Sequence, residues 1–523
     1  MYAINGIIEG SICMRNICIS CKTLAPGVVV YREKENTGQL EFIDFHMKFG
    51  GELNPRNRWV RLAKLIPWGE FEKEYVRHFP SKTGNPAKPF RMALGALLIK
   101  EMKNLTDEEL VEDIRENPYY QYLLGLECYQ DDPPFEASSL VHFRKRISRE
   151  MLSEINEKIV KRMIAFETRE PEGSKDDESP ASTDSSDAEM DDDATAEETT
   201  HKGKLLVDAT CVPSDIRYPT DLGLLNEARE KLEEIIDVLH GSLQGAARKP
   251  RTYRVRARKD FLRVSRNRKP RKNAIRKGIR QQLQYIRRDM HHIDGLAEKA
   301  GLTVLDRRMY RNLLVVREVY RQQQEMFSQN KHKVENRIVS IHQPHVRPII
   351  RGKVTAPVEF GAKISVSKVD GYAFLETLGW DPYNEGGRLK DHIEAYKRRF
   401  GYYPKSVHAD KIYRTRENLR HCKELGIRLG GPPLGRPPKD REAYRELLRE
   451  SRQDEIDRIP IEGVFGVAKR SYTLDRVRTK LDMTSETTIA MVILAMNLKK
   501  IVKDLFVFIQ WLFRHCNIRL VLV

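Results

Sequence analysis

Cysteine is scarce in this chain: there are seven in 523 residues, and only Cys18 and Cys21 form a CxxC pair. A structural zinc site needs four ligands, and no second pair or suitably spaced histidines accompany this one. Proteins built on disulfides use far more cysteine. We therefore expect neither a zinc centre nor a disulfide framework, and we expect a reduced, intracellular setting.

Long apolar runs are missing as well. No stretch reaches the roughly 20 apolar residues of a membrane span, and the longest candidate, Leu505 to Phe513, is about half that length. The N-terminal apolar residues are interrupted by Glu9, Arg15 and Asn16, which argues against a signal peptide. These absences predict a cytoplasmic protein without a membrane partner.

Acidic residues are fewer than basic ones, with 75 Asp and Glu against 92 Lys and Arg, a formal charge of +17. Such a surplus suits a partner with dense negative charge, most simply nucleic acid. Ribosomal, membrane-surface and chaperone-like proteins share a basic average, so charge alone does not decide. The length predicts about two to four domains.

Two segments are expected to lack a stable fold. Residues 1–45 show no strong periodicity and are interpreted as a weakly structured leader. Residues 167–203 are predicted to be an acidic, disordered linker, because Glu167 to Thr200 holds fourteen acidic and two basic residues with few large apolar ones. Its charge of −12 leaves +29 on the rest of the chain. The segment could be a passive linker or a tail that competes with DNA for a basic surface.

Residues 46–166 have a helical apolar periodicity. Thr106 and Glu109 have the spacing of a capping box, and Asn117-Pro118 should end that helix. Ser138 or Ser139 is predicted to cap one long helix reaching Ile159. Short helices with basic residues, including Arg144, Lys145 and Arg146, favour a helix-turn-helix DNA-binding domain. An all-helical scaffold or dimerisation domain is the alternative.

Residues 222–334 are interpreted as a basic helical insertion. From Arg248 to Arg280 there are sixteen Lys or Arg residues and one acid, Asp260. Such a segment repels itself unless phosphates neutralise it, which favours a DNA contact surface. Its candidate contacts include Arg254, Arg256 and Arg258. A solvated helical face is the alternative.

The rest of the chain alternates strands and helices. Strands are predicted at Lys204–Thr210, Ile338–Ile341, Lys363–Val369, Lys405–Asp410 and Ile427–Leu429, and helices at Arg388–Phe400 and Thr415–Leu425. This order favours a mixed α/β sheet flanked by helices. We assign residues 204–221 and 335–475 to a catalytic domain and 476–523 to a C-terminal helical region, whose apolar part packs on the sheet.

Three carboxylates carry the expected chemistry. Asp208 and Asp410 each close a predicted strand, and Glu462 lies on a late helix. Oxygen ligands with room for water and phosphate suit Mg²⁺ or Mn²⁺, and two such ions can drive an in-line phosphoryl transfer. Each residue taken singly could instead be a cap or a surface charge.

The sequence around Glu462 is the most specific. Lys469 lies seven residues, two helical turns, beyond Glu462, so both should share one face, with Lys469 and Arg458 directed at phosphates. Gly463 and Gly466 lower helix stability, which suggests close approach by a backbone or by DNA.

These motifs resemble those of the DDE transposases of bacterial insertion sequences, over about Leu53 to Leu498. The RxxxExxxxxxK spacing of Arg458, Glu462 and Lys469 is similar to their third motif, and VDAT at Asp208 and HADKIY at Asp410 resemble the first and second. RWVRLAKLIPW, FRMALGALLIK and SSLVHFRKR resemble their N-terminal helical domain. The family's tyrosine three residues before the arginine is replaced by Glu455.

The resemblance implies an RNase H-like fold interrupted by the insertion. It also implies hydrolysis at a transposon end and attack of the freed 3′-hydroxyl on target DNA, using two Mg²⁺ (or Mn²⁺) ions. Partners would be terminal inverted repeats, target DNA and a second copy in a homodimer, in the nucleoid of a bacterium. A nuclease that cuts without joining, and a catalytically idle DNA-binding protein, are the rival functions.

Two smaller signals remain open. Gly435-Arg436-Pro437 is either a minor-groove hook, with Arg436 entering the groove, or a simple turn. Trp380 either stacks on an unpaired base or packs in the core.

Overall fold

The computed structural model describes residues 52–79, 87–167, 201–243, 245, 248–350, 357–432 and 440–515. The predicted leader, Cys18, Cys21, nearly all of the acidic linker and Arg436 lie outside these residues. The chain divides into two compact units, one up to Ala96 together with Val111–Arg146 and the other comprising Leu97–Leu110 and Ile147–Val523.

The first unit is built from short helices. They are α1 (Arg58–Leu65), α2 (Trp68–Val76), the first part of α3 (Phe90–Lys103), most of α4 (Asp107–Glu116), α5 (Pro118–Leu123) and α6 (Ser139–Arg146). Asn117 caps α5 by accepting from the Tyr119 amide, with Pro118 in the first turn. Trp59 on α1 meets Tyr120 on α5 edge to face at 4.9 Å.

The local helix signals are confirmed in part. The capping box forms as predicted, since Glu109 accepts from the Thr106 amide at 2.8 Å and Thr106 accepts from the Glu109 amide at 3.2 Å. The single long helix to Ile159 is wrong. The chain breaks after α6, and α7 (Arg149–Glu167) begins afresh. Ser148 starts it, because its hydroxyl accepts from the Met151 amide as an N-cap does.

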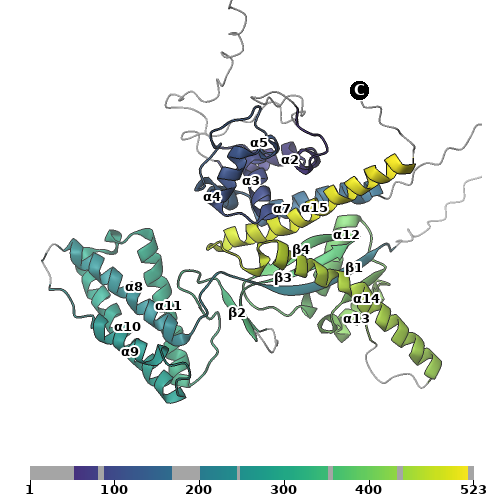
Figure 1. The fold of residues 1–523 in the computed structure, drawn as a ribbon. Helices are drawn as coiled ribbons and strands as arrows, with labels where there is room; N and C mark the ends of the chain where they lie inside the picture. The colour runs from purple at the N-terminus through teal and green to yellow at the C-terminus, as the bar shows by residue number, and fades with distance from the viewer. Residues whose placement is uncertain are drawn as a thin grey trace, which may run out of the picture. The chain divides into compact units, whose positions relative to one another are not determined.

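The second unit contains a six-stranded mixed sheet, which confirms the predicted α/β class (Figure 1). Its strands are β1 (Lys204–Pro213), β2 (Arg347–Ile350), β3 (Val358–Val369), β4 (Tyr372–Gly379), β5 (Ser406–Ala409) and β6 (Arg428–Leu429). The order is β2-β3-β1-β5-β6, with β4 also pairing with β3. β5 runs parallel to β1 and β6, and the other pairings are antiparallel.

Two strand predictions need correction. β1 does not close at Asp208 but continues to Pro213, because β3 pairs with it from Leu206 through Pro213. The segment Ile338–Ile341 is not a strand. Ile338 and Ile341 are buried in the core of the helical insertion, and the Ile338 amide donates to the Gln322 side chain. β2 and β4 were not predicted.

Helices cover the sheet. α15 (Asp482–His515) packs on α7 and β4, while α14 (Arg441–Ser471) packs on β1 and β5. α12 (Leu389–Phe400) and α13 (Arg416–Glu424) connect β4, β5 and β6 in the chain. Among the described residues, no helix is both long and apolar enough to cross a membrane.

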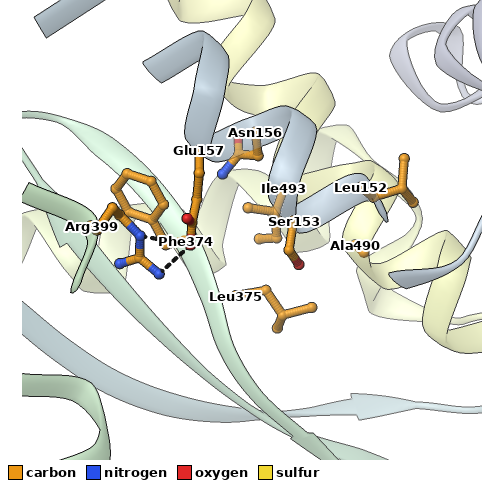
Figure 2. Close-up of a pocket in the computed structure, with 9 residues that line it drawn as sticks. All are labelled: Leu152, Ser153, Asn156, Glu157, Phe374, Leu375, Arg399, Ala490 and Ile493. Carbon is orange, nitrogen blue, oxygen red and sulfur yellow. Dashed lines mark hydrogen bonds and ion pairs between the residues drawn. The ribbon is translucent and has the colours of Figure 1, made fainter. Parts of the chain in front are cut away.

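A buried polar network joins α7, β4 and α12 in the second unit (Figure 2). Arg399 is 6% exposed; its Nε donates to Glu157 and its Nη1 to Glu376, both at 2.9 Å. The guanidinium also lies 4.2 Å from the centre of the Phe374 ring. Opposite charges and a ring face therefore compensate a cation that burial would otherwise make costly.

The described residues of the insertion form four α-helices: α8 (Asp221–Ser242), α9 (Arg254–Ser265), α10 (Lys272–Ala300) and α11 (Arg307–Gln329). Leucine, isoleucine and valine side chains from α8, α10 and α11 form a core of their own. At its base, the Asp221 carboxylate accepts from both Gln323 and Arg337. The start and end of the insertion are thus tied together.

Gly361 on β3 provides a test of the sheet. A Cβ there would lie 2.0 Å from the Val212 carbonyl oxygen on β1. We expect Gly361→Ala to lower the free energy of unfolding by about 1–3 kcal/mol through overpacking. The matched control is Gly387→Ala, whose Cβ would meet nothing within 4 Å. Urea unfolding of both variants checks this. Equal midpoints would show that β1 and β3 can move apart to accommodate the added Cβ without a loss of stability.

Candidate active site

The sheet topology brings two of the predicted carboxylates to adjacent positions. β1 and β5 are parallel, and their pairing ends with Val207 opposite Ala409. The next residues along the chain are Asp208, within β1, and Asp410, immediately after β5. Neighbouring strands lie about 4.8 Å apart, so the two backbones present these carboxylates side by side.

Asp208 lies in a partly enclosed environment. Its side chain is 16% exposed, and one oxygen accepts from the Ala209 amide at 2.8 Å. Burial raises its pKa from 3.8 to about 6, and the carboxylates of Glu385 and Asp410 add to the rise, while the Ala209 hydrogen bond and Arg458 oppose it. Asp410 is exposed and accepts from the Lys411 amide at 2.7 Å.

Arg458 links the third carboxylate to the first. From α14, its Nη2 lies 2.8 Å from Glu462 Oε1, and its Nη1 lies 3.8 Å from Asp208 Oδ2. The Glu462 side chain is 55% exposed. One guanidinium therefore holds two of the three predicted carboxylates, and it is occupied within the chain in this arrangement.

α14 is fastened to the sheet on both sides of Glu462. Lys469 donates to the Cys211 carbonyl at 2.7 Å, and Lys368 on β3 donates to the Pro460 carbonyl at 3.1 Å. Lys469 thus contacts β1, two turns from Glu462 along the same helix. The bond to Cys211 uses one of the three ammonium N–H donors of Lys469, and the expected contact with a phosphate would use another.

The glycines beside Glu462 have no close neighbour that explains them within the chain. A Cβ at Gly463 would meet nothing within 4 Å, and one at Gly466 would meet only the Arg470 side chain at 3.3 Å. No other backbone of the described residues comes within 4 Å of a Cβ at either glycine, so the close approach by DNA, the other alternative, stays a prediction. The helix surface next to Glu462 is open.

The donor set suits a hard divalent cation. Asp208, Asp410 and Glu462 offer carboxylate oxygens, which Mg²⁺ and Mn²⁺ prefer, with open space beside Glu462. In the described part of the chain no three acidic, histidine or cysteine side chains are gathered closely enough to hold an ion as they stand. Arg458 supplies the positive charge between Asp208 and Glu462.

A fourth carboxylate near Asp208, that of Glu385, was not predicted from the sequence. Glu385 pairs with Lys363 at 2.8 Å and contributes to the raised pKa of Asp208. Gly386 holds this turn against the chain after Asp410, since a Cβ there would lie 2.6 Å from the Ile412 carbonyl oxygen. The buried Asn418 amide fixes the contact by donating to the carbonyls of both Gly386 and Tyr413. The sequence signal for this turn is NEGGR at residues 384–388, where two glycines follow Glu385.

The basic residues predicted on α6 differ in exposure. Arg144 is buried at 5% exposure, so it does not face solvent. Lys145 is exposed, and the Arg146 guanidinium lies 4.3 Å from the centre of the Phe79 ring. Of the three, Lys145 has the side chain that is most accessible to a phosphate.

The insertion presents the larger basic surface. Arg254 is engaged internally, donating to Asp237 at 2.7 Å, whereas Arg256 and Arg258 are exposed. More exposed cations follow on α9, the connecting loop and the start of α10. They are Lys259, Arg263, Arg266, Arg268, Lys269, Arg271, Lys272, Arg276, Lys277 and Arg280. A surface of this kind matches the charge of a nucleic-acid backbone.

Trp380 is half-buried rather than presented to solvent. Its indole N–H donates to Glu486 at 3.1 Å, and its ring meets His345 edge to face at 4.3 Å. Both contacts favour the packing interpretation over stacking on a base.

Two family models match this sequence. One, described as "Transposase DDE domain", covers residues 407–499, which include Asp410 and Glu462 but not Asp208. The other, described as "Transposase domain (DUF772)", covers residues 48–146. A relative from Rhizobium meliloti, "Uncharacterized protein ORF8 in nfe locus", is 30% identical over 188 residues, which are 36% of this chain and 77% of that protein. No solved structure matches.

Proposed function

Because this chain belongs to the DDE transposases of insertion sequences, we propose that it cleaves DNA at the ends of its element and transfers the freed 3′-hydroxyls to target DNA. Asp208, Asp410 and Glu462 are the proposed catalytic carboxylates. One observation carries the assignment: β1 and β5 pair up to Val207 and Ala409, and the residue that follows in each segment is an aspartate. Arg458 then draws Glu462 toward Asp208.

The three carboxylates would hold two Mg²⁺ or Mn²⁺ ions. When bound, such ions activate the attacking oxygen and stabilise the leaving one in an in-line displacement. The chain's own part is to fix the acceptors on a rigid sheet and to keep Asp208 partly shielded from water. A scissile phosphate would compete for the Arg458 guanidinium, since arginine binds phosphate as well as carboxylate in a forked geometry. Glu462 would then be free to join the other two.

The remaining parts have proposed roles around this site. The sheet and its helices would be an RNase H-like catalytic domain formed by residues 204–221 and 335–475. Residues 46–166 would bind the terminal repeats, with Lys145 among the contacts, and residues 222–334 would grip DNA through Arg256 and Arg258. Two ends must be held at once, so the active form would be a homodimer on DNA, in the nucleoid.

A joining assay tests this function. The full chain is incubated with Mg²⁺ or Mn²⁺, target plasmid and a labelled duplex of the element's terminal sequence, already cut to expose its 3′-hydroxyl. We expect the label to become joined to the plasmid without an added energy source, because one phosphodiester is exchanged for another. Release of shortened ends without joining would favour a nuclease, and binding with neither reaction would favour an idle DNA-binding protein. Either result would overturn the proposal.

A further inference from the structure

The first part of α14, Arg441–Gln453, extends beyond the body of the second unit (Figure 1). We call this segment the arm. Apart from Leu447 and Ser451, every arm side chain that the structure describes is exposed, including Tyr444 and Leu448. A helix of about three turns without packing is marginal in water. The arm therefore gains stability when a partner lies along it.

The charges of the arm are sorted by face. Arg441, Arg445, Arg449 and Arg452 follow one another at spacings of four, four and three, so they form a single stripe along the helix. Like charges at this spacing repel each other. All four are exposed and have no ion pair within the described residues. The arginine stripe is thus a row of exposed cations that form no ion pair among the described residues.

Glu442, Glu446 and Glu450 lie on the neighbouring face of the helix, and this face meets the sheet from Glu450 onward. Glu450 lies 3.8 Å from Arg428 on β6, and further along this face Asp454 binds the same guanidinium at 2.8 Å. Asp457 binds Lys204 on β1 at 2.7 Å. Because Glu450, Asp454 and Asp457 are directed at the body, the arginine stripe is left facing away from it.

The arginine stripe runs toward the proposed active site. Continued at the same spacing, its face passes Ile456 and Ile459, both more than half exposed, to Gly463, where the helix surface is open. Glu462 is the residue next to Gly463. A long partner bound along the stripe would therefore pass beside Glu462.

We propose that the arginine stripe binds the phosphate backbone of double-stranded DNA flanking the bond that is cut. The inference rests on the proposed function and adds a contact surface to it. Arg441 to Arg452 spans about 16 Å at about 1.5 Å per residue, which is the rise of about five base pairs of duplex. A row of regularly spaced cations fits a regularly spaced polyanion better than it fits a protein surface of mixed charge.

A salt titration tests the stripe. The variant carries Arg441→Gln, Arg445→Gln, Arg449→Gln and Arg452→Gln in the full chain, which keeps helix propensity because glutamine is a good helix former. Since each phosphate contact contributes about 0.9 to the slope of log K against log salt, we expect the slope for end-DNA binding to become shallower by about 2–4. At fixed moderate salt the affinity should fall about 10- to 100-fold. An unchanged slope would overturn the inference.

The matched control is Glu442→Gln with Glu446→Gln, on the neighbouring face. If the stripe acts locally, this control should keep its affinity within about twofold. If only the net charge of the arm mattered, the control, which removes two negative charges against four positive ones, would raise log K by about half of what the arginine variant lowers it, and the inference would fail.

Cross-linking locates the partner. A photoreactive phenylalanine analogue at Arg445 should cross-link to end DNA, whereas the same residue at Glu446 should not. Cross-linking of Arg445 to a second copy of the chain, or equal yields at both positions, would contradict a DNA-binding stripe. Failure of the joining assay with stripe-dependent DNA binding intact would reject the proposed reaction and leave this surface standing.

Discussion

Asp208→Asn should reduce both end cleavage and joining by at least about a thousandfold, which corresponds to about 4 kcal/mol of transition-state stabilisation. The substitution keeps the size of the side chain and removes its charge. Asparagine cannot supply the carboxylate that Asp208 places beside Asp410 at the end of the β1–β5 pairing. Binding of end DNA should stay within a few-fold of the wild type, because the exposed cations of the insertion are untouched. Gel-based cleavage and joining assays, with binding measured in parallel, check both expectations.

The stability of Asp208→Asn is the control that separates lost chemistry from lost folding. In the folded chain the pKa of Asp208 is raised from 3.8 to about 6, chiefly by burial. The folded state therefore holds its proton more tightly than the unfolded state, so the wild type loses stability as pH rises from about 4 to about 6. The loss is about 3 kcal/mol at pH 7, and asparagine avoids it.

Without divalent cations, the variant should thus unfold at the same or a higher urea concentration than the wild type at pH 7, and the difference should shrink at pH 4. A variant that unfolds much earlier would make Asp208 a structural residue. Wild-type cutting by a well-folded variant would remove Asp208 from the mechanism.

Arg399→Met should lower the free energy of unfolding by about 3–5 kcal/mol, because it leaves the buried Glu376 and the half-buried Glu157 without their cation. Glu376 is 5% exposed and would keep only the Ser367 hydroxyl as a side-chain partner in the described network, while Glu157 would lose its bond to Arg399 (Figure 2). The two acids lie on β4 and α7, so the loss would weaken the docking of that helix on the sheet. Urea unfolding followed by circular dichroism measures the effect.

The comparison variant is Lys390→Met, which breaks the pair that Lys390 makes with Glu417 at 2.7 Å, where the partners are 40% and 75% exposed. Exposed pairs contribute about 1 kcal/mol or less. Adding Glu376→Leu to Arg399→Met should recover part of the lost free energy of unfolding, because leucine leaves no buried charge without a partner. If Arg399→Met and Lys390→Met lowered the free energy of unfolding equally, the buried network would contribute no more to stability than an exposed ion pair.

The features predicted correctly from sequence depend on neighbours in the chain. The capping box needs only Thr106 and Glu109, and the strand ending at Asp410 is bounded by its own composition. The helix at α13 starts at Thr415, whose hydroxyl accepts from the Asn418 amide, as a residue of that type at that position favours. Such local signals act over three or four residues.

The features that were missed depend on contacts between distant segments. β1 extends past Asp208 because β3, far away in the sequence, pairs with it to the end. Ile338–Ile341 has the composition of a strand, but its two isoleucines are buried in the core of the insertion. The bridge of Arg458 between Asp208 and Glu462 needs α14 to lie on β1, which no spacing within one segment encodes.

The contact of Asp221 with Arg337 at the base of the insertion affects how the sheet can form during folding. β1 and β3 are adjacent in the sheet, yet about 145 residues separate Pro213 from Val358. Closing so long a loop is entropically costly, but a bundle that forms first and joins Asp221 to Arg337 shortens the free chain to about 30 residues. This lowers the closure cost by about 1 kcal/mol. Early formation of the bundle would therefore speed β1–β3 pairing, and the long excursion between these strands need not slow folding.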